Sequence, residues 1–145
     1  MSGEKGGGGK ENNKLVFSGV EEAQEFFKND RFATTNGMKV DEIGEDYAVC
    51  SMEIHENHLN AAGTVMGGVY FTLADFAFAV SVNNVHKVTV GMDSNITFLV
   101  PAKGDKLIAT SRVMRTGKTT TFCEVQVKDS FDRLCAVFTG TAFKL

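Results

Sequence analysis

The sequence predicts an α+β domain in which one long helix lies beside five or six antiparallel strands. A stretch from about Met66 to Asn83 is apolar on every side, which is typical of a helix enclosed by its own protein or by a partner. Alternating runs rich in β-branched and aromatic residues, separated by short turns with Gly, Asp and Lys, indicate the strands. Periodicity alone does not select their topology.

The elements follow in order along the chain. A short helical pattern covers Glu21 to Asn29, and two alternating runs, Met38 to Ile43 and Tyr47 to Ile54, flank a Gly44-Glu45-Asp46 turn and predict a hairpin. A polar loop from Glu56 to Thr64 leads into the long helix. Four more strands are predicted, each antiparallel to its neighbour in sequence: Lys87 to Val100, Lys106 to Arg115, Thr119 to Lys128 and Arg133 to Lys144.

Length and composition indicate one globular domain. The 145 residues are 43% hydrophobic, which is enough apolar material for a core. A formal net charge of -3 argues against a broad basic surface for DNA or RNA. Residues 1–14 are predicted to be a flexible leader without the apolar core of a signal peptide, and residues 15–145 a single domain. No apolar run reaches the roughly 20 residues that span a bilayer, so we expect a cytoplasmic protein.

Cysteine and histidine spacing does not predict a metal site. Cys50, Cys123 and Cys135 have no CxxC spacing and lie in β-like apolar contexts, so we expect them to pack as small hydrophobic residues. His55 and His58 have glutamate neighbours, but no third soft ligand is spaced nearby. We therefore expect no metal.

The long apolar stretch carries one charge, Asp75. It is the only Asp, Glu, Lys, Arg or His between Leu59 and Val85. A carboxylate in apolar surroundings is costly unless it is hydrogen-bonded, paired or used in chemistry. Two interpretations are open at this point: a buried carboxylate satisfied by a neighbouring donor, or a catalytic carboxylate.

A longer pattern surrounds Asp75. The chain has HLNAAGTVMGG from His58 to Gly68 and LAD from Leu73 to Asp75. Together these segments resemble the HxN-x-x-G-x-x-HGG-x(6)-D pattern of hotdog-fold thioesterases of the PaaI (phenylacetate-pathway) type. Asn95 to Ala102 and Arg115 to Thr119 also resemble family segments. The resemblance covers about Asn36 to Leu145 and implies a hotdog fold, in which the sheet wraps around the long central helix.

The resemblance implies hydrolysis of an acyl-CoA thioester. Free N–H groups at a helix N-terminus favour developing negative charge, and glycine lets a ligand approach the backbone. By analogy with the family, the Gly67 amide polarises the thioester carbonyl and Asn60 orients the carbonyl or the attacking water. Asp75 acts as general base or as nucleophile. Taken singly, Gly67 is equally a close-packed helix start, and Asn60 a residue that caps its own turn.

The family's oligomer explains how these groups meet. Gly67 and Asp75 are about 12 Å apart along one helix, too far to act on one carbon. In the family, two antiparallel central helices lie side by side in a dimer, so Asp75 of one subunit faces Gly67 and Asn60 of the other. We expect a homodimer that pairs into a homotetramer.

The resemblance implies coenzyme A as a part of the substrate rather than a separate cofactor. Its path follows the segment Phe98 to Lys103 and the hairpin Arg115 to Thr120, whose cationic side chains and backbone amides would meet phosphates. The substrate-binding residues expected on this basis are Gly68, Met66, Gly91, Phe98, Lys103, Arg115, Gly117, Lys118 and Thr119.

Two positions depart from the family pattern. Met66 stands where the HGG histidine is usual, so any role of that imidazole in holding the thioester or water is lost. We expect turnover to survive, but to be slower or shifted in substrate preference. Gly91 stands where some relatives carry a Ser or Thr that helps to position the water.

Other functions stay open beside hydrolysis. A catalytically weak acyl-CoA-binding protein would bind thioesters tightly without releasing thiol. A hotdog dehydratase or hydratase is disfavoured, because those relatives use a catalytic His with Glu or Asp in proline-rich contexts, and this chain has one proline and no histidine in or beside the helix. In a purely structural module, Asp75→Leu would be neutral or stabilising.

Overall fold

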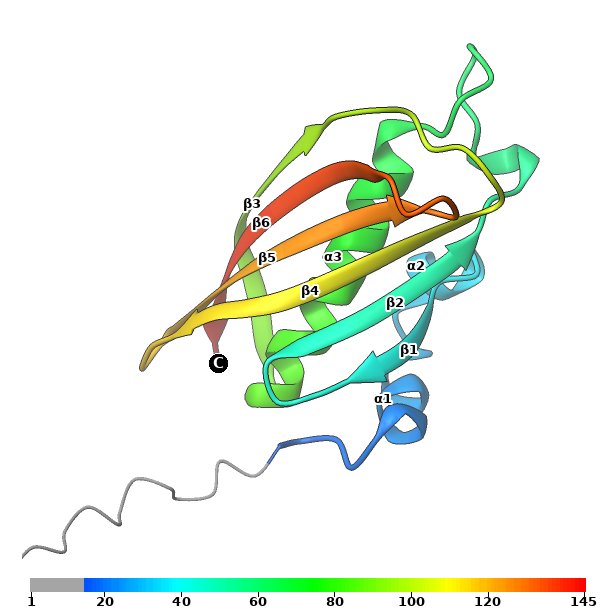
Figure 1. The fold of residues 1–145 in the computed structure, drawn as a ribbon. Coiled ribbons are helices and arrows are strands. Elements are labelled where there is room, and N and C mark those ends of the chain that lie inside the picture. The colour runs from blue at the N-terminus through cyan, green and yellow to red at the C-terminus, as the bar shows by residue number, and fades with distance from the viewer. Residues whose placement is uncertain (1–14) are drawn as a thin grey trace, which may run out of the picture.

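The computed structural model describes residues 15–145, in which a six-stranded antiparallel sheet curves around the long helix α3 (Figure 1). This is the predicted hotdog arrangement, and the predicted leader lies outside the described residues. No helix in residues 15–145 is long and apolar enough to cross a membrane. The elements are α1 (Val20–Phe27), α2 (Arg31–Thr35), β1 (Lys39–Ile43), β2 (Tyr47–Glu53), the 3-10 helix η2 (Glu56–His58), α3 (Gly67–Val85), β3 (Thr89–Phe98), β4 (Lys106–Thr116), β5 (Thr120–Asp129) and β6 (Leu134–Lys144).

The strand order is β1-β2-β4-β5-β6-β3. The prediction that each late strand pairs with its neighbour in sequence is therefore wrong for β3, which pairs with β6 at the far edge. The 19 residues of α3 span about 28 Å and carry the chain across the concave face of the sheet. β4, rather than β3, therefore pairs with β2. β3 becomes the outer strand at the other edge of the sheet.

The core lies between α3 and the concave face of the sheet. Leu73, Ala77 and Val80 of the helix are completely buried, and alternate residues of β5 point toward them with the period of two expected of a strand. Gly140 on β6 permits a close approach, because a Cβ there would lie 2.9 Å from Cζ of Phe78. The three cysteines are free and buried in this core, which agrees with their expected packing.

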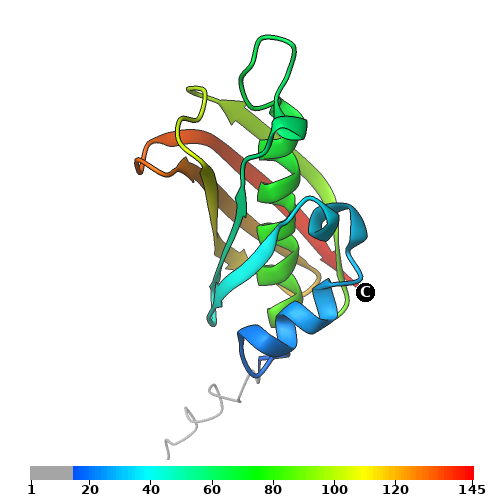
Figure 2. The ribbon, with the colours of Figure 1, turned by 90° about the vertical axis from the view of Figure 1, so that its right-hand side faces the viewer.

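The N-terminal helices cover another part of the molecule, where α1 lies against β1 and α2 against α3 (Figure 2). The sequence predicted a single helix here, and α2 was missed because its five residues are too few to show a helical period. Asn84 anchors this region: its Oδ1 accepts the Phe17 amide at 2.9 Å and its Nδ2 donates to the Gly44 carbonyl at 3.0 Å.

Asn84→Ala is expected to lower the free energy of unfolding by about 2–4 kcal/mol, because two partners lose hydrogen bonds at a buried site. Urea unfolding followed by circular dichroism measures the change. The control is Asn29→Ala, which removes an exposed amide and is expected to change stability by less than about 0.5 kcal/mol. A loss for Asn84→Ala as small as that of the control would contradict this role.

Candidate functional site

The start of α3 offers two free backbone donors. The N-cap residue is Met66, whose side chain makes no capping hydrogen bond. The first N–H groups of a helix have no acceptor within the helix, and no hydrogen bond in residues 15–145 uses the amide of Gly67 or Gly68. Because the positive pole of the helix lies here, these amides suit an oxygen atom that gains negative charge.

Gly67 faces a mainly apolar pocket of about 290 Å³. A Cβ at Gly67 would lie only 3.1 Å from Cζ of Phe98, so the absence of a side chain lets the Phe98 ring lie against the helix start. The ring also meets Tyr70, with 5.9 Å between ring centroids. The pocket is lined by Thr64, Val65, Gly67, Tyr70, Phe98, Leu99, Val100 and Pro101.

Asn60 orders the loop that precedes this pocket. Its Oδ1 accepts the amide of Ala62 at 2.9 Å and the amide of Thr64 at 3.1 Å, so the side chain does cap its own turn. Its Nδ2 donates to no group within residues 15–145. Capping thus fixes the carboxamide and leaves its N–H donors for a ligand.

Asp75 lies on a face of α3 that the sheet leaves uncovered. Its side chain is solvent-accessible in the single chain and lines a pocket of about 340 Å³ with Phe32, Phe71 and other residues. No donor in residues 15–145 forms a hydrogen bond or ion pair with its carboxylate. Desolvation raises the pKa of Asp75, and the negative charge of Asp30 raises it further. The neighbouring donor of the structural interpretation is therefore not found within the described chain.

One chain does not bring Asp75 to Gly67. Their two pockets have no lining residue in common, and eight residues of helix separate them by about 12 Å. Met66 and Gly68 instead line a third pocket of about 320 Å³, which has Phe32 and Thr72 in common with the Asp75 pocket. Met66, Gly68 and Asp75 therefore follow the same side of α3.

The expected CoA-binding residues are divided between two ends of the sheet. Phe98 is the last residue of β3 and Lys103 precedes β4, whereas Arg115 to Thr119 lie at the opposite end of β4 and in the turn after it. The β4–β5 turn lies at the opposite end of the sheet from the β3–β4 connection (Figure 1). Strand geometry places these ends about 33 Å apart, so one chain cannot hold one CoA with both. The Gly117 amide donates to the Thr120 carbonyl at 2.7 Å and is not free for a phosphate. Gly91 is exposed on β3.

Comparisons with known proteins identify the family. Residues 62–136 match the Thioesterase superfamily. The chain is 31% identical over 124 residues to "Acyl-coenzyme A thioesterase PaaI" of Escherichia coli (strain K12). The matched region covers 85% of this chain and 89% of that protein. The chain belongs to the PaaI-type hotdog thioesterase family.

A solved structure and a second relative match similar lengths of the chain. The solved structure of the E. coli PaaI protein from the phenylacetic acid degradation operon superposes with a TM-score of 0.81 at 30% identity, over 86% of this chain and 91% of that one. A "Putative esterase" of Archaeoglobus fulgidus is 33% identical over 128 residues, 87% of this chain and 83% of the relative.

Tyr70 and Asp30 are among the pocket residues that the sequence did not identify. Tyr70 lies three positions after Gly67 and lines the same pocket, so helical spacing of i, i+3 was an available signal. Asp30 lies at the start of α2 and reaches the Asp75 pocket from a distant part of the chain. No local pattern indicates that approach.

Two substitutions separate the loop-capping role of Asn60 from its free N–H donors. Asn60→Ala removes the hydrogen bonds that Oδ1 accepts from the amides of Ala62 and Thr64 and is expected to speed exchange at these amides by about 10-fold or more. Asn60→Asp keeps acceptor oxygens and is expected to keep exchange at these amides near the wild-type rate. Hydrogen exchange by NMR measures both. Equally fast amide exchange at Ala62 and Thr64 in the two variants would show that the Asn60 Oδ1 atom does not order the loop.

Proposed function

We propose that the chain hydrolyses acyl-CoA thioesters to a free acid and CoA in the cytoplasm. The observation that carries this proposal is the pair of unpartnered amides at the start of α3, where Gly67 opens to a pocket. It is supported by the name of the E. coli relative, an acyl-coenzyme A thioesterase. The resemblance of Asn60, Gly67 and Asp75 to the family pattern supports a reaction at these residues.

The proposed chemistry uses neutral donors for the carbonyl and one carboxylate for the attack. The thioester oxygen accepts the Gly67 N–H, while the Nδ2 group of Asn60 orients the carbonyl or water. As general base, Asp75 takes a proton from water as the water oxygen bonds to the acyl carbon, and the CoA thiolate leaves. As nucleophile, the Asp75 carboxylate bonds to the acyl carbon and displaces the CoA thiolate, which gives an acyl anhydride that water then hydrolyses to the free acid and the carboxylate. Both routes need an ionised carboxylate in one place.

A shared site between two copies completes the proposal. β3 is a 10-residue edge strand with Val90 41% and Met92 60% exposed, and such an edge is a template for pairing with another strand. Antiparallel pairing of two β3 strands sets two α3 helices side by side in opposite directions. Asp75 then approaches the partner subunit's Gly67, and the Arg115 to Thr119 turn approaches the Lys103 end of the other copy. We infer a homodimer that pairs into a homotetramer.

Asp75→Asn is expected to lower kcat for thiol release by about 100-fold or more, the range for loss of a general base. Short, medium, long-chain and aromatic acyl-CoAs are compared, which also ranks the acyl groups. Asp41→Asn is the control, because Asp41 is an exposed carboxylate on β1 at the opposite edge of the sheet. It is expected to keep wild-type turnover.

Two outcomes would contradict the proposed hydrolysis. Undiminished turnover by Asp75→Asn would remove Asp75 from the reaction. Tight thioester binding without thiol release by folded wild type would favour the acyl-CoA-binding alternative. The observation that favours this alternative is Met66, which stands where the family usually has a histidine.

Asp30→Asn is expected to move the acidic limb of the kcat/KM profile to lower pH. Activity rises as Asp75 ionises, and the charge of Asp30 contributes to the raised pKa of Asp75, so its removal lowers that pKa. Asn is also a good N-cap residue, which preserves the start of α2. Kinetics from pH 4 to 8 test the shift, and a limb that stays in place or moves upward contradicts it.

The stability of Asp75→Asn distinguishes lost chemistry from lost folding. A carboxyl group whose pKa is raised in the folded state stabilises the fold at low pH and loses that contribution as pH rises through the raised pKa. At neutral pH the uncharged Asn variant is therefore expected to be at least as stable as wild type in thermal unfolding.

A further inference from the structure

One wall of the Gly67 pocket comes from a segment that has left the sheet. Both Leu99 and Val100 direct their amides to the Cys135 carbonyl, at 2.7 and 3.4 Å, and strand pairing resumes only at Lys106. Leu99, Val100 and Pro101 line the pocket. Main-chain contact with a neighbouring strand is made again at Asp105, whose carbonyl accepts the Ile54 amide at 2.8 Å. Other contacts must therefore hold the chain from Pro101 to Lys103, next to the pocket wall.

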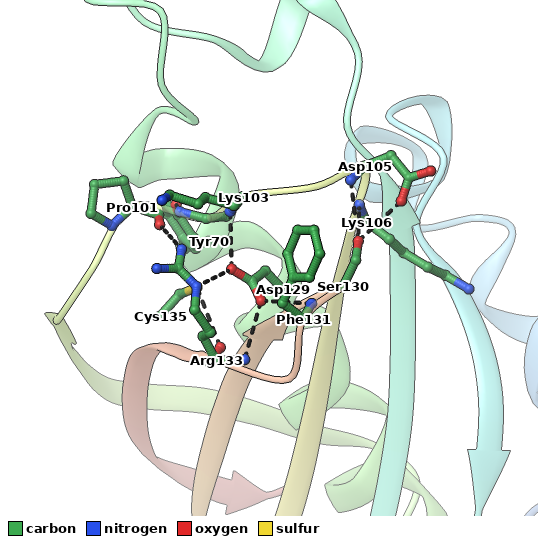
Figure 3. Close-up of polar contacts among 11 residues, drawn as sticks. Tyr70, Pro101, Lys103, Asp105, Lys106, Asp129, Ser130, Phe131, Arg133 and Cys135 are labelled. Carbon is green, nitrogen blue, oxygen red and sulfur yellow. Dashed lines mark hydrogen bonds and ion pairs between the residues drawn. The ribbon is translucent and has the colours of Figure 1, made fainter.

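Side chains from α3 and the β5–β6 turn hold that segment (Figure 3). The Tyr70 hydroxyl accepts the Ala102 amide at 2.9 Å, and Asp129 Oδ2 accepts the Lys103 amide at 2.9 Å. Arg133 Nη2 donates to the Pro101 carbonyl at 2.6 Å. Three successive residues are thus fixed through their backbone.

A second contact closes the far end of the segment. Ser130 Oγ accepts the amides of Asp105 and Lys106 at 3.1 and 3.0 Å, and donates to the Asp105 carboxylate at 3.0 Å. Residues at the β5–β6 turn therefore hydrogen-bond to the segment at two places, near Lys103 and at Asp105 (Figure 3).

Asp129 is the centre of this arrangement. Its side chain is 0% exposed, and its Oδ1 accepts the amides of Phe131 and Arg133 at 2.9 and 3.1 Å. Its Oδ2 accepts Arg133 Nε at 2.9 Å in addition to the Lys103 amide. Burial raises the pKa of Asp129, but these N–H groups outweigh burial and hold the pKa well below its ordinary value. The carboxylate is ionised and fully hydrogen-bonded.

The two oxygens of Asp129 serve different purposes. Oδ1 bonds only within the turn, as Asp often does in a turn of this kind. Oδ2 reaches Lys103, which is 26 residues earlier in the chain, and it orients the guanidinium that holds Pro101. A carboxylate that only closed its own turn would not need these two contacts.

We propose that Asp129 is a positioning residue for the CoA thioester, holding the Pro101 to Lys103 backbone so that the pocket wall and the main chain that carries Lys103 stay in place. The inference rests on the proposed thioesterase function. Asp129 does not touch the reacting atoms; it acts through the segment that lies against the thioester and CoA.

Asp129→Asn in the full chain is the test. It replaces an acceptor by an NH2 group that faces N–H donors, so the segment loosens. We expect KM for the best acyl-CoA and Kd for free CoA to rise by about 10-fold or more, while kcat changes by less than about twofold because Asp75, Asn60 and Gly67 lie on other elements. Thiol release and isothermal titration calorimetry with CoA give these values.

The matched control is Asp132→Asn. It removes the same charge from the same turn, but the Asp132 side chain is 85% exposed and pairs with Lys128 at 3.4 Å. Its φ of 63° suits Asn, which tolerates this left-handed conformation. KM and Kd are expected to stay at wild-type values. An equal rise in both variants would assign the effect to long-range charge and overturn the inference.

Hydrogen exchange separates local positioning from general destabilisation. In Asp129→Asn, peptides that cover residues 99–105 are expected to exchange faster by about 10-fold or more, with residues 39–53 of the β1–β2 hairpin unchanged. Faster exchange throughout the chain with unchanged KM and Kd would mean that Asp129 only stabilises the fold. If Asp129→Asn does not fold, Arg133→Lys loses the fork that reaches Pro101 and is expected to raise Kd in the same direction.

The wild type distinguishes this inference from the proposed function. If wild type binds CoA without releasing thiol and Asp129→Asn weakens binding, hydrolysis fails and the positioning role stands. If wild type hydrolyses thioesters and Asp129→Asn keeps both KM and Kd, the positioning role fails alone. If wild type neither binds CoA nor hydrolyses its thioesters, both fail.

Discussion

The packing of α3 against the concave face of the sheet is the constraint on which the rest of the structure depends. Leu73, Ala77 and Val80 bury one side of the helix completely, and this contact fixes where the helix starts and ends. The start presents the free amides of Gly67 and Gly68 at the edge of the sheet. The end of the helix lies near β6, so the next strand, β3, pairs with β6 and becomes an exposed outer strand. A donor site and an edge for pairing thus follow from one packing contact.

Most of the fold is predictable because its patterns are local. The apolar run of α3 and the alternation in β4, β5 and β6 identify these elements within a few residues. The partner of β3 is not predictable in this way, because it depends on where the helix crosses the sheet. The five residues of α2 are too few for a helical period, although this helix supplies one wall of the Asp75 pocket.

The candidate site was predictable in part, through a resemblance of pattern rather than through periodicity. The spacing of Asn60, Gly67 and Asp75 was found in the sequence, but the two pockets in which Gly67 and Asp75 lie are visible only in three dimensions. Asp129 falls between the predicted strands Thr119 to Lys128 and Arg133 to Lys144, so the sequence indicates only a turn residue there. Its bond to Lys103 joins segments that are distant in sequence, and no local signal distinguishes such an Asp from one that only closes a turn.

The substitution at position 66 decides which groups of the site can titrate. Met66 adds neither a donor nor an ionisable group. His58 lines the same pocket, but its Nδ1 accepts the His55 amide at 2.9 Å, and desolvation followed by the influence of His55 lowers the pKa of His58. Burial thus disfavours the charged imidazolium form of His58. The proposed donors, the Gly67 amide and Asn60 Nδ2, do not titrate. The proposed role of Asp75 therefore gives the acidic limb its carboxylate component, and the Asp30 charge acts on that component.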